Sequence, residues 1–172
     1  MTLLEQIRQD PRLAEQLAVH FDFDVTSLDP VEEVWLADGV RLTPIAGDSA
    51  GGTFLQTPSG AVVYAGSEGE GGLIAHTLRD ALGLVVGLPS LHDALSRPLG
   101  DDLTAWLASC DDEIREDFPE LDATRTEVRE ALDLPAVDTL VAALHAAAAD
   151  VSFRPIGEHG PYDSMATGDR PA

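Results

Sequence analysis

The stretch "VRLTPIAGDSAGGTFLQTPSGAVVYA" (Val40 to Ala65) decides the fold of this chain. It contains short runs rich in β-branched and aromatic residues, and turn signals made of glycine, proline and serine separate these runs. A further such run lies upstream, across an Asp-Gly dipeptide typical of a two-residue hairpin. The pattern predicts an antiparallel four-stranded meander. The predicted strands are Glu32–Ala37, Val40–Ala46, Gly52–Thr57 and Ala61–Ala65.

Helical spacing dominates the sequence on both sides of this stretch. Downstream, one apolar stripe runs from Ile74 to Val86, and further amphipathic segments follow as far as the alanine run near residue 148. Upstream, Asp10-Pro11 marks the start of a second N-terminal helix. The segment Val151–Ile156 is a candidate fifth strand. The sequence therefore predicts one α+β domain over residues 1–156, with a disordered tail over residues 157–172.

Length and composition limit the classes of protein to consider. A chain of 172 residues fits one domain, and it lacks the roughly 18 consecutive apolar residues of a membrane span. The N-terminus has neither a basic leader nor an apolar core, so we expect a cytoplasmic protein. Cys110 is the only cysteine, which excludes an internal disulfide and a cysteine-based zinc site. The five histidines have no ligand spacing, so no metal or other cofactor is expected.

The chain is strongly acidic, with 31 acids, ten arginines, no lysine and a net charge of −21. The joint absence of lysine and asparagine is typical of a high-GC bacterium. Nucleic acids and anionic membranes require a basic surface, so neither is an expected partner, whereas a basic protein is. The oligomeric state stays open. The candidate partner-binding residues are Asp111, Asp112, Glu113, Glu116 and Asp117 in one helix, and Glu68 and Glu70 in a loop.

Two serines raise the alternative of a serine hydrolase. Ser49 lies in a Gly-x-Ser-x-Gly pattern, "GDSAGG", which matches the consensus of the nucleophile elbow in serine hydrolases. The residues that follow it favour a strand, whereas an elbow serine opens a helix, so we predict a hairpin turn at Ser49. Ser67 is expected between a strand and a helix, but the sequence nominates no histidine or oxyanion donor for it.

The central third of the chain, Val40 to Leu95, resembles the SUKH superfamily, which includes bacterial immunity proteins and fungal cell-wall assembly regulators. The resemblance rests on the order of a Pro-hydrophobic strand end, a Gly-rich turn, a strand with an aromatic residue, a strand with Val and Tyr, and a helix with an apolar stripe. It implies an α+β domain with no catalytic centre that binds another protein, which in the bacterial members is often a secreted nuclease toxin or another toxin that the domain neutralises. The matching segments are Thr43–Ala46, Asp48–Gly52, Phe54–Gln56, Val62–Tyr64 and Ile74–Val86.

Three functions follow as hypotheses. The first is an acidic, non-enzymatic protein-binding module, an immunity protein that neutralises a basic toxin. The second is a small hydrolase that uses Ser49 or Ser67, and the third is a ligand-binding regulatory domain, which a pocket between sheet and helices would favour. The predicted core residues are Trp35, Phe54, Leu55, Val63, Ile74, Leu78, Leu82 and Trp106.

Overall fold

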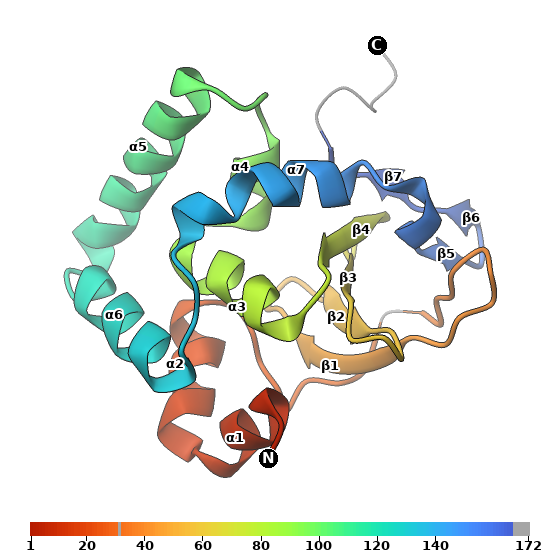
Figure 1. The fold of residues 1–172 in the computed structure, drawn as a ribbon, viewed down its shortest axis with the longest axis horizontal. Helices are drawn as coiled ribbons and strands as arrows, with labels where there is room; N and C mark the ends of the chain where they lie inside the picture. Colours follow the sequence, from red (N-terminus) through yellow and green to blue (C-terminus); the bar gives the residue numbers. More distant parts are fainter. Residues whose placement is uncertain (31, 167–172) are drawn as a thin grey trace.

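The computed structural model describes residues 1–30 and 32–166, which form one α+β domain (Figure 1). Seven α-helices and two short 3-10 helices surround a mixed sheet in this part of the chain. The α-helices are α1 Leu3–Gln9, α2 Pro11–His20, α3 Leu78–Gly87, α4 Leu91–Leu95, α5 Asp101–Asp117, α6 Leu121–Leu132 and α7 Val141–Ala148. The 3-10 helices are η1 Val137–Thr139 and η2 Val151–Phe153.

The main sheet has the strand order β1-β2-β3-β4-β7. Its first four strands pair antiparallel, which confirms the four-stranded meander, and β7 adds to β4 in parallel. A separate two-stranded hairpin is formed by β5 and β6. The strands are β1 Thr43–Gly47, β2 Thr53–Gln56, β3 Val62–Ala65, β4 Glu70–Ala75, β5 Ile156–Gly157, β6 Gly160–Pro161 and β7 Asp163–Ser164.

The meander lacks the first predicted strand, Glu32–Ala37, and has an additional strand, β4, after the last predicted one. The predicted strand Glu32–Ala37 is an irregular segment that makes only an isolated bridge, between Trp35 and Ile156. The fourth strand is instead β4, where we predicted the start of a helix. The helix α3 begins only at Leu78, because the Thr77 side chain accepts a hydrogen bond from the Asp80 amide and caps it.

Both faces of the sheet are covered, so successive side chains of a strand enter different clusters. Phe54 packs in the main core with the helices, whereas Leu55 packs on the other face with Val34 and Tyr162. Both are buried, since period-2 alternation leaves no exposed face here. Six of the eight predicted core residues are buried. Trp35, at 42% exposure, and the half-buried Trp106 are the errors.

The C-terminal part differs from the sequence prediction. The candidate fifth strand Val151–Ile156 starts as the 3-10 helix η2, and only Ile156 belongs to a strand, which pairs in the small hairpin. Residues 157–166, which we assigned to a tail, contribute β6 and β7. The rest of the predicted tail, residues 167–172, lies outside the described residues. No helix in the described ranges has the length and apolar character needed to cross a bilayer.

Candidate functional site

The helices α5 and α6 form an arm at the edge of the molecule farthest from the β5–β6 hairpin (Figure 1). We call residues 101–133 the acidic arm. They contain twelve carboxylates and three arginines. The carboxylates are those of Asp101, Asp102, Asp111, Asp112, Glu113, Glu116, Asp117, Glu120, Asp122, Glu127, Glu130 and Asp133.

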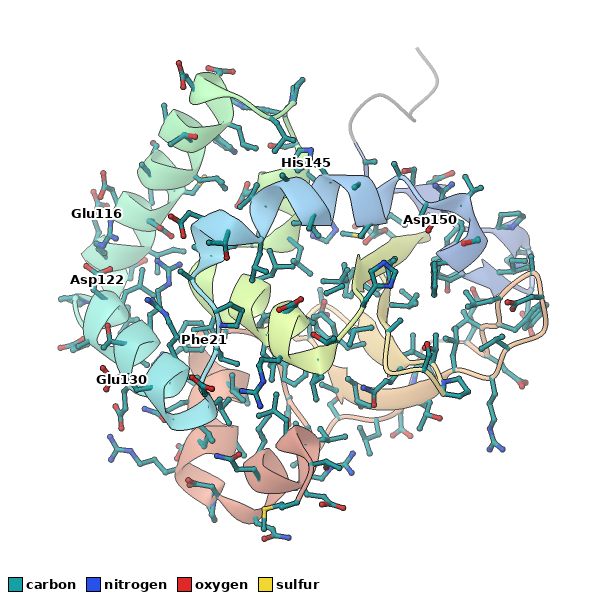
Figure 2. All side chains as sticks on the ribbon, viewed as in Figure 1. Phe21, Glu116, Asp122, Glu130, His145 and Asp150 are labelled. Carbon is teal, nitrogen blue, oxygen red and sulfur yellow. The ribbon has the colours of Figure 1, made fainter. Side chains whose placement is uncertain are left out.

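The arm presents most of its acids to solvent. In the 17 residues of α5, only Leu103 and Cys110 are buried. Figure 2 shows Glu116 of α5 and Asp122 and Glu130 of α6 along the outer edge of the arm, away from the sheet. An exposed face with this excess of one charge creates a negative field that reaches beyond the helix surface.

The sequence grouped Asp111 with the exposed acids, but the structure places it in a buried ion pair. Its carboxylate accepts hydrogen bonds from the Arg125 guanidinium at 2.8 and 3.0 Å. The two side chains are only 17% and 7% exposed, and Arg125 also donates to the carbonyl of Val86 at 2.8 Å. Arg125 therefore joins α6 to α5 through Asp111 and to the end of α3 through Val86.

A second arginine neutralises part of the outer surface. Arg115 pairs with Asp112 at 2.8 Å and with Asp122 at 2.9 Å. The hydrogen bond from Arg115 holds the pKa of Asp122 below its usual value. Glu113, Glu116 and Asp117 are exposed and form no ion pair among the described residues. These three are the free part of the predicted cluster.

An apolar groove of about 430 Å³ lies on the other side of α5, between this helix and the segment η1–α7. Leu99 at one end of the groove is 52% exposed. Asp111 and Asp138 are the acids of its lining, which contains no basic residue. No sequence motif indicates this groove, because its walls come from the separate segments 87–89, 99–111 and 137–142. Its apolar lining residues are Leu88, Pro89, Leu99, Leu103, Leu107, Ala108, Val137, Val141 and Ala142.

The other predicted acids, Glu68 and Glu70, lie on a different part of the molecule. Glu68 is in the tight turn between β3 and β4, and Glu70 begins β4. Glu70 lies 3.3 Å from the imidazole of His92 in α4. No described interaction joins these residues to the acidic arm, so the structure separates the two predicted groups.

A smaller cavity of about 160 Å³ opens between the sheet and the helices. Tyr64 and Phe54 of the sheet, Asp48 of the β1–β2 turn, and His20 and His92 of the helices line it. The Tyr64 hydroxyl donates to Asp48 at 2.5 Å, and burial together with the neighbouring carboxylates raises the Tyr64 pKa above its usual value. Tyr64 is therefore a neutral hydrogen-bond donor at physiological pH. The sequence analysis missed this cavity too, although Asp48 lies inside the "GDSAGG" motif.

Ser49 lies in the hairpin turn between β1 and β2, as predicted. The turn closes because Gly51 has φ of 94° and Asp48 accepts hydrogen bonds from the amides of Ala50 and Gly52. Ser49 donates its amide hydrogen and its hydroxyl hydrogen to Asp22, at 2.7 and 3.2 Å. Among the described residues, no histidine is hydrogen-bonded to Ser49.

The prediction that Ser67 stands between a strand and a helix is wrong. Ser67 is in the turn of the β3–β4 hairpin, because the segment after it forms β4 rather than α3. Neither serine thus lies at a strand-to-helix elbow. In residues 1–30 and 32–166, no three His, Cys, Asp or Glu side chains are grouped to hold a metal ion.

Comparisons with protein-family models, with curated proteins and with solved structures give no match for this chain.

Proposed function

We propose that this chain is a non-enzymatic protein-binding module whose partner is a basic protein, and in its most specific form an immunity protein that neutralises a basic, nuclease-type toxin. The observation that carries the proposal is the acidic arm. It concentrates twelve carboxylates against three arginines, and two of these arginines are held in ion pairs within the arm. A basic partner would supply the missing positive charge.

Electrostatics gives such a surface a specific function. Complementary charge raises the rate of encounter and discriminates against partners of the wrong sign. A nuclease needs a basic cleft to grip nucleic acid, and an acidic module could occlude that cleft. The resemblance of Val40 to Leu95 to the SUKH superfamily supports the same reading, since bacterial members often bind toxins.

The direct test is co-expression with the product of the neighbouring open reading frame. We expect that product to be basic, to form a stable complex with this chain in gel filtration, and to be harmless to cells only when the chain is present. Association should slow steeply between low and physiological salt, because the Debye length falls to about 8 Å. A neighbouring toxin that kills cells regardless of this chain would contradict the immunity form of the proposal.

The hydrolase hypothesis is tested separately with generic ester substrates. We expect Ser49→Ala and Ser67→Ala to leave any background hydrolysis unchanged, since both serines lie in hairpin turns. A loss of about 10³-fold or more in either variant would identify a nucleophile and overturn the non-enzymatic proposal.

The cavity beside Tyr64 favours a second candidate, a ligand-binding regulatory domain. Aromatic rings and the carboxylates of Asp22 and Asp48 line part of this space and suit a small organic cation, while the Arg125 guanidinium that also lines it is paired with Asp111. Thermal-shift measurements with arginine, agmatine and choline test this candidate. A stabilisation that the Asp48→Asn variant loses would support it, and the absence of any shift at millimolar ligand would contradict it.

A further inference from the structure

We infer that the groove between α5 and η1–α7 is the docking site for a basic amphipathic helix of the partner protein. This inference rests on the proposed function and names the part of the partner that is recognised. It concerns the inner side of α5, whereas the proposed function depends on the charge of the arm as a whole.

One wall of the groove has the spacing of a helix ridge. On α5, Leu103, Leu107 and Asp111 follow one another at intervals of four residues. The facing wall consists of Val137 in the 3-10 helix η1 and of Val141 and Ala142 at the start of α7. A ridge at i and i+4 is a surface against which a further helix packs.

The size of the groove also suits a helix. Within α5 the wall runs from Leu103 to Asp111, which is about 12 Å at the rise of an α-helix, or about two turns. The lining includes the small, exposed side chains of Ala108 and Ala142, one on each wall. Small residues let another backbone approach closely, and Leu107 in the same wall is only half-buried.

Charge selects the occupant. Asp138 borders the apolar floor, and Asp101 and Asp102 begin α5 at the Leu99 end, whereas Asp111 is neutralised by Arg125. A second copy of this chain would bring another charge of −21 to the same surface, which disfavours self-association through the groove. A helix with an apolar stripe at i, i+3, i+4 and i+7, flanked by arginine or lysine, matches both the floor and the rim.

The probe for the test is a displayed library of 18-residue helical peptides in which every position is varied between apolar, basic, acidic and small residues. It is selected against the full chain. We expect the selected peptides to be basic and to carry one apolar stripe. Ala108→Arg and Ala142→Arg should each weaken their binding at least about tenfold, because they place bulk and positive charge in the groove.

Ala123→Arg is the matched control. Ala123 is an exposed residue of α6 outside the groove lining, and its substitution changes the net charge by the same amount. Peptides that bind all three variants equally well, or that lack an apolar stripe, would overturn the inference while leaving the charge-based proposal intact. A selection that yields no basic peptides would contradict both. Unfolding curves of the variants exclude a loss of fold as the cause.

Discussion

The sheet with its covering helices and the acidic arm are built on opposite principles. All four residues of β3 and five of the six residues of β4 are buried, and seven of the ten residues of α3 are buried. By contrast, only two of the 17 residues of α5 are buried. The first region is held by apolar packing on both faces. In the arm, α6 packs Leu121, Val128 and Leu132 into the main core, whereas α5 stays at the surface and exposes its charge.

This difference separates stability from recognition. Apolar burial supplies most of the folding free energy, so substitutions in the sheet region should act on the free energy of unfolding. Exposed charges contribute little to stability but shape the field that a partner meets. The exception within the arm is the buried ion pair of Arg125 with Asp111, which joins α6 to α5, while Arg125 also donates to the Val86 carbonyl of α3.

We expect Arg125→Met to cause the largest loss of stability, about 3 to 5 kcal/mol, because it leaves the Asp111 carboxylate buried without its partner. Arg12→Met is the control, since Arg12 and Glu127 form an exposed ion pair whose removal should cost less than about 1 kcal/mol. Urea denaturation measures both. Adding Asp111→Leu to Arg125→Met should restore part of the loss, and no restoration would contradict the uncompensated charge as its cause.

A second prediction compares two leucines directly. Leu82→Ala in α3 removes a fully buried side chain from the main core and should cost about 2 to 5 kcal/mol. Leu107→Ala in α5 removes a half-buried side chain and should cost about 1 kcal/mol. Similar losses in chemical denaturation would mean that α5 is as firmly packed as the core, which would contradict the contrast between α5 and the sheet region.

Strand propensity and helix-capping residues in the sequence predicted those strands and helices whose signals lie within a few neighbouring residues. The runs at β1, β2 and β3 are rich in β-formers, and Asp10-Pro11 begins α2 with the Asp10 side chain as its cap. The strand β4 was missed because "EGEGGLIA" has low β-propensity and Ile74 continues the helical spacing of α3. The glycines of β4 allow a helix to pack closely on this strand. A Cβ atom on Gly72 would lie 3.5 Å from the backbone of Ala148, so α7 packs directly on this strand.

Long-range contacts explain the remaining errors. The segment around Trp35 pairs with Ile156, and Glu32 accepts a hydrogen bond from the Tyr162 hydroxyl at 2.6 Å. These partners lie more than 120 residues away, so no local pattern reveals them. The same applies to the candidate site, where the sequence located the acids but not the Arg125 partner of Asp111 or the facing wall of the groove.

The third prediction concerns the turn that imitates a nucleophile elbow. Tyr64→Phe removes the donor to Asp48 and should lower the free energy of unfolding by about 1 to 2 kcal/mol, because the half-buried carboxylate loses its shortest hydrogen bond. Ser49→Ala removes an exposed bond of 3.2 Å from the same turn and should change stability by less than about 0.5 kcal/mol. Thermal and urea unfolding check the pair. Equal effects would show that the Asp48–Tyr64 bond does not anchor this turn to the sheet.

The smallest effect on stability should come from the outer face of the arm. We expect the triple variant Glu113→Gln, Glu116→Gln, Asp117→Asn to keep the free energy of unfolding within about 0.5 kcal/mol or to raise it slightly. These acids repel one another, and two of them lie beside the negative end of α5. The same variant should associate about tenfold more slowly with a basic partner at low salt, as stopped-flow mixing would measure.

Extending this variant by Asp111→Asn separates the two roles of the acidic cluster. Asp111 is held by Arg125, so its neutralisation should cost about 3 kcal/mol of stability, whereas the outer acids carry the charge that a partner meets first. The quadruple variant should therefore unfold at lower urea but associate at nearly the rate of the triple variant. If the triple variant already loses stability, the outer acids are part of the fold. If it associates at the rate of the native chain, the field of the arm does not guide binding, and the loop of Glu68 and Glu70 becomes the surface to neutralise next.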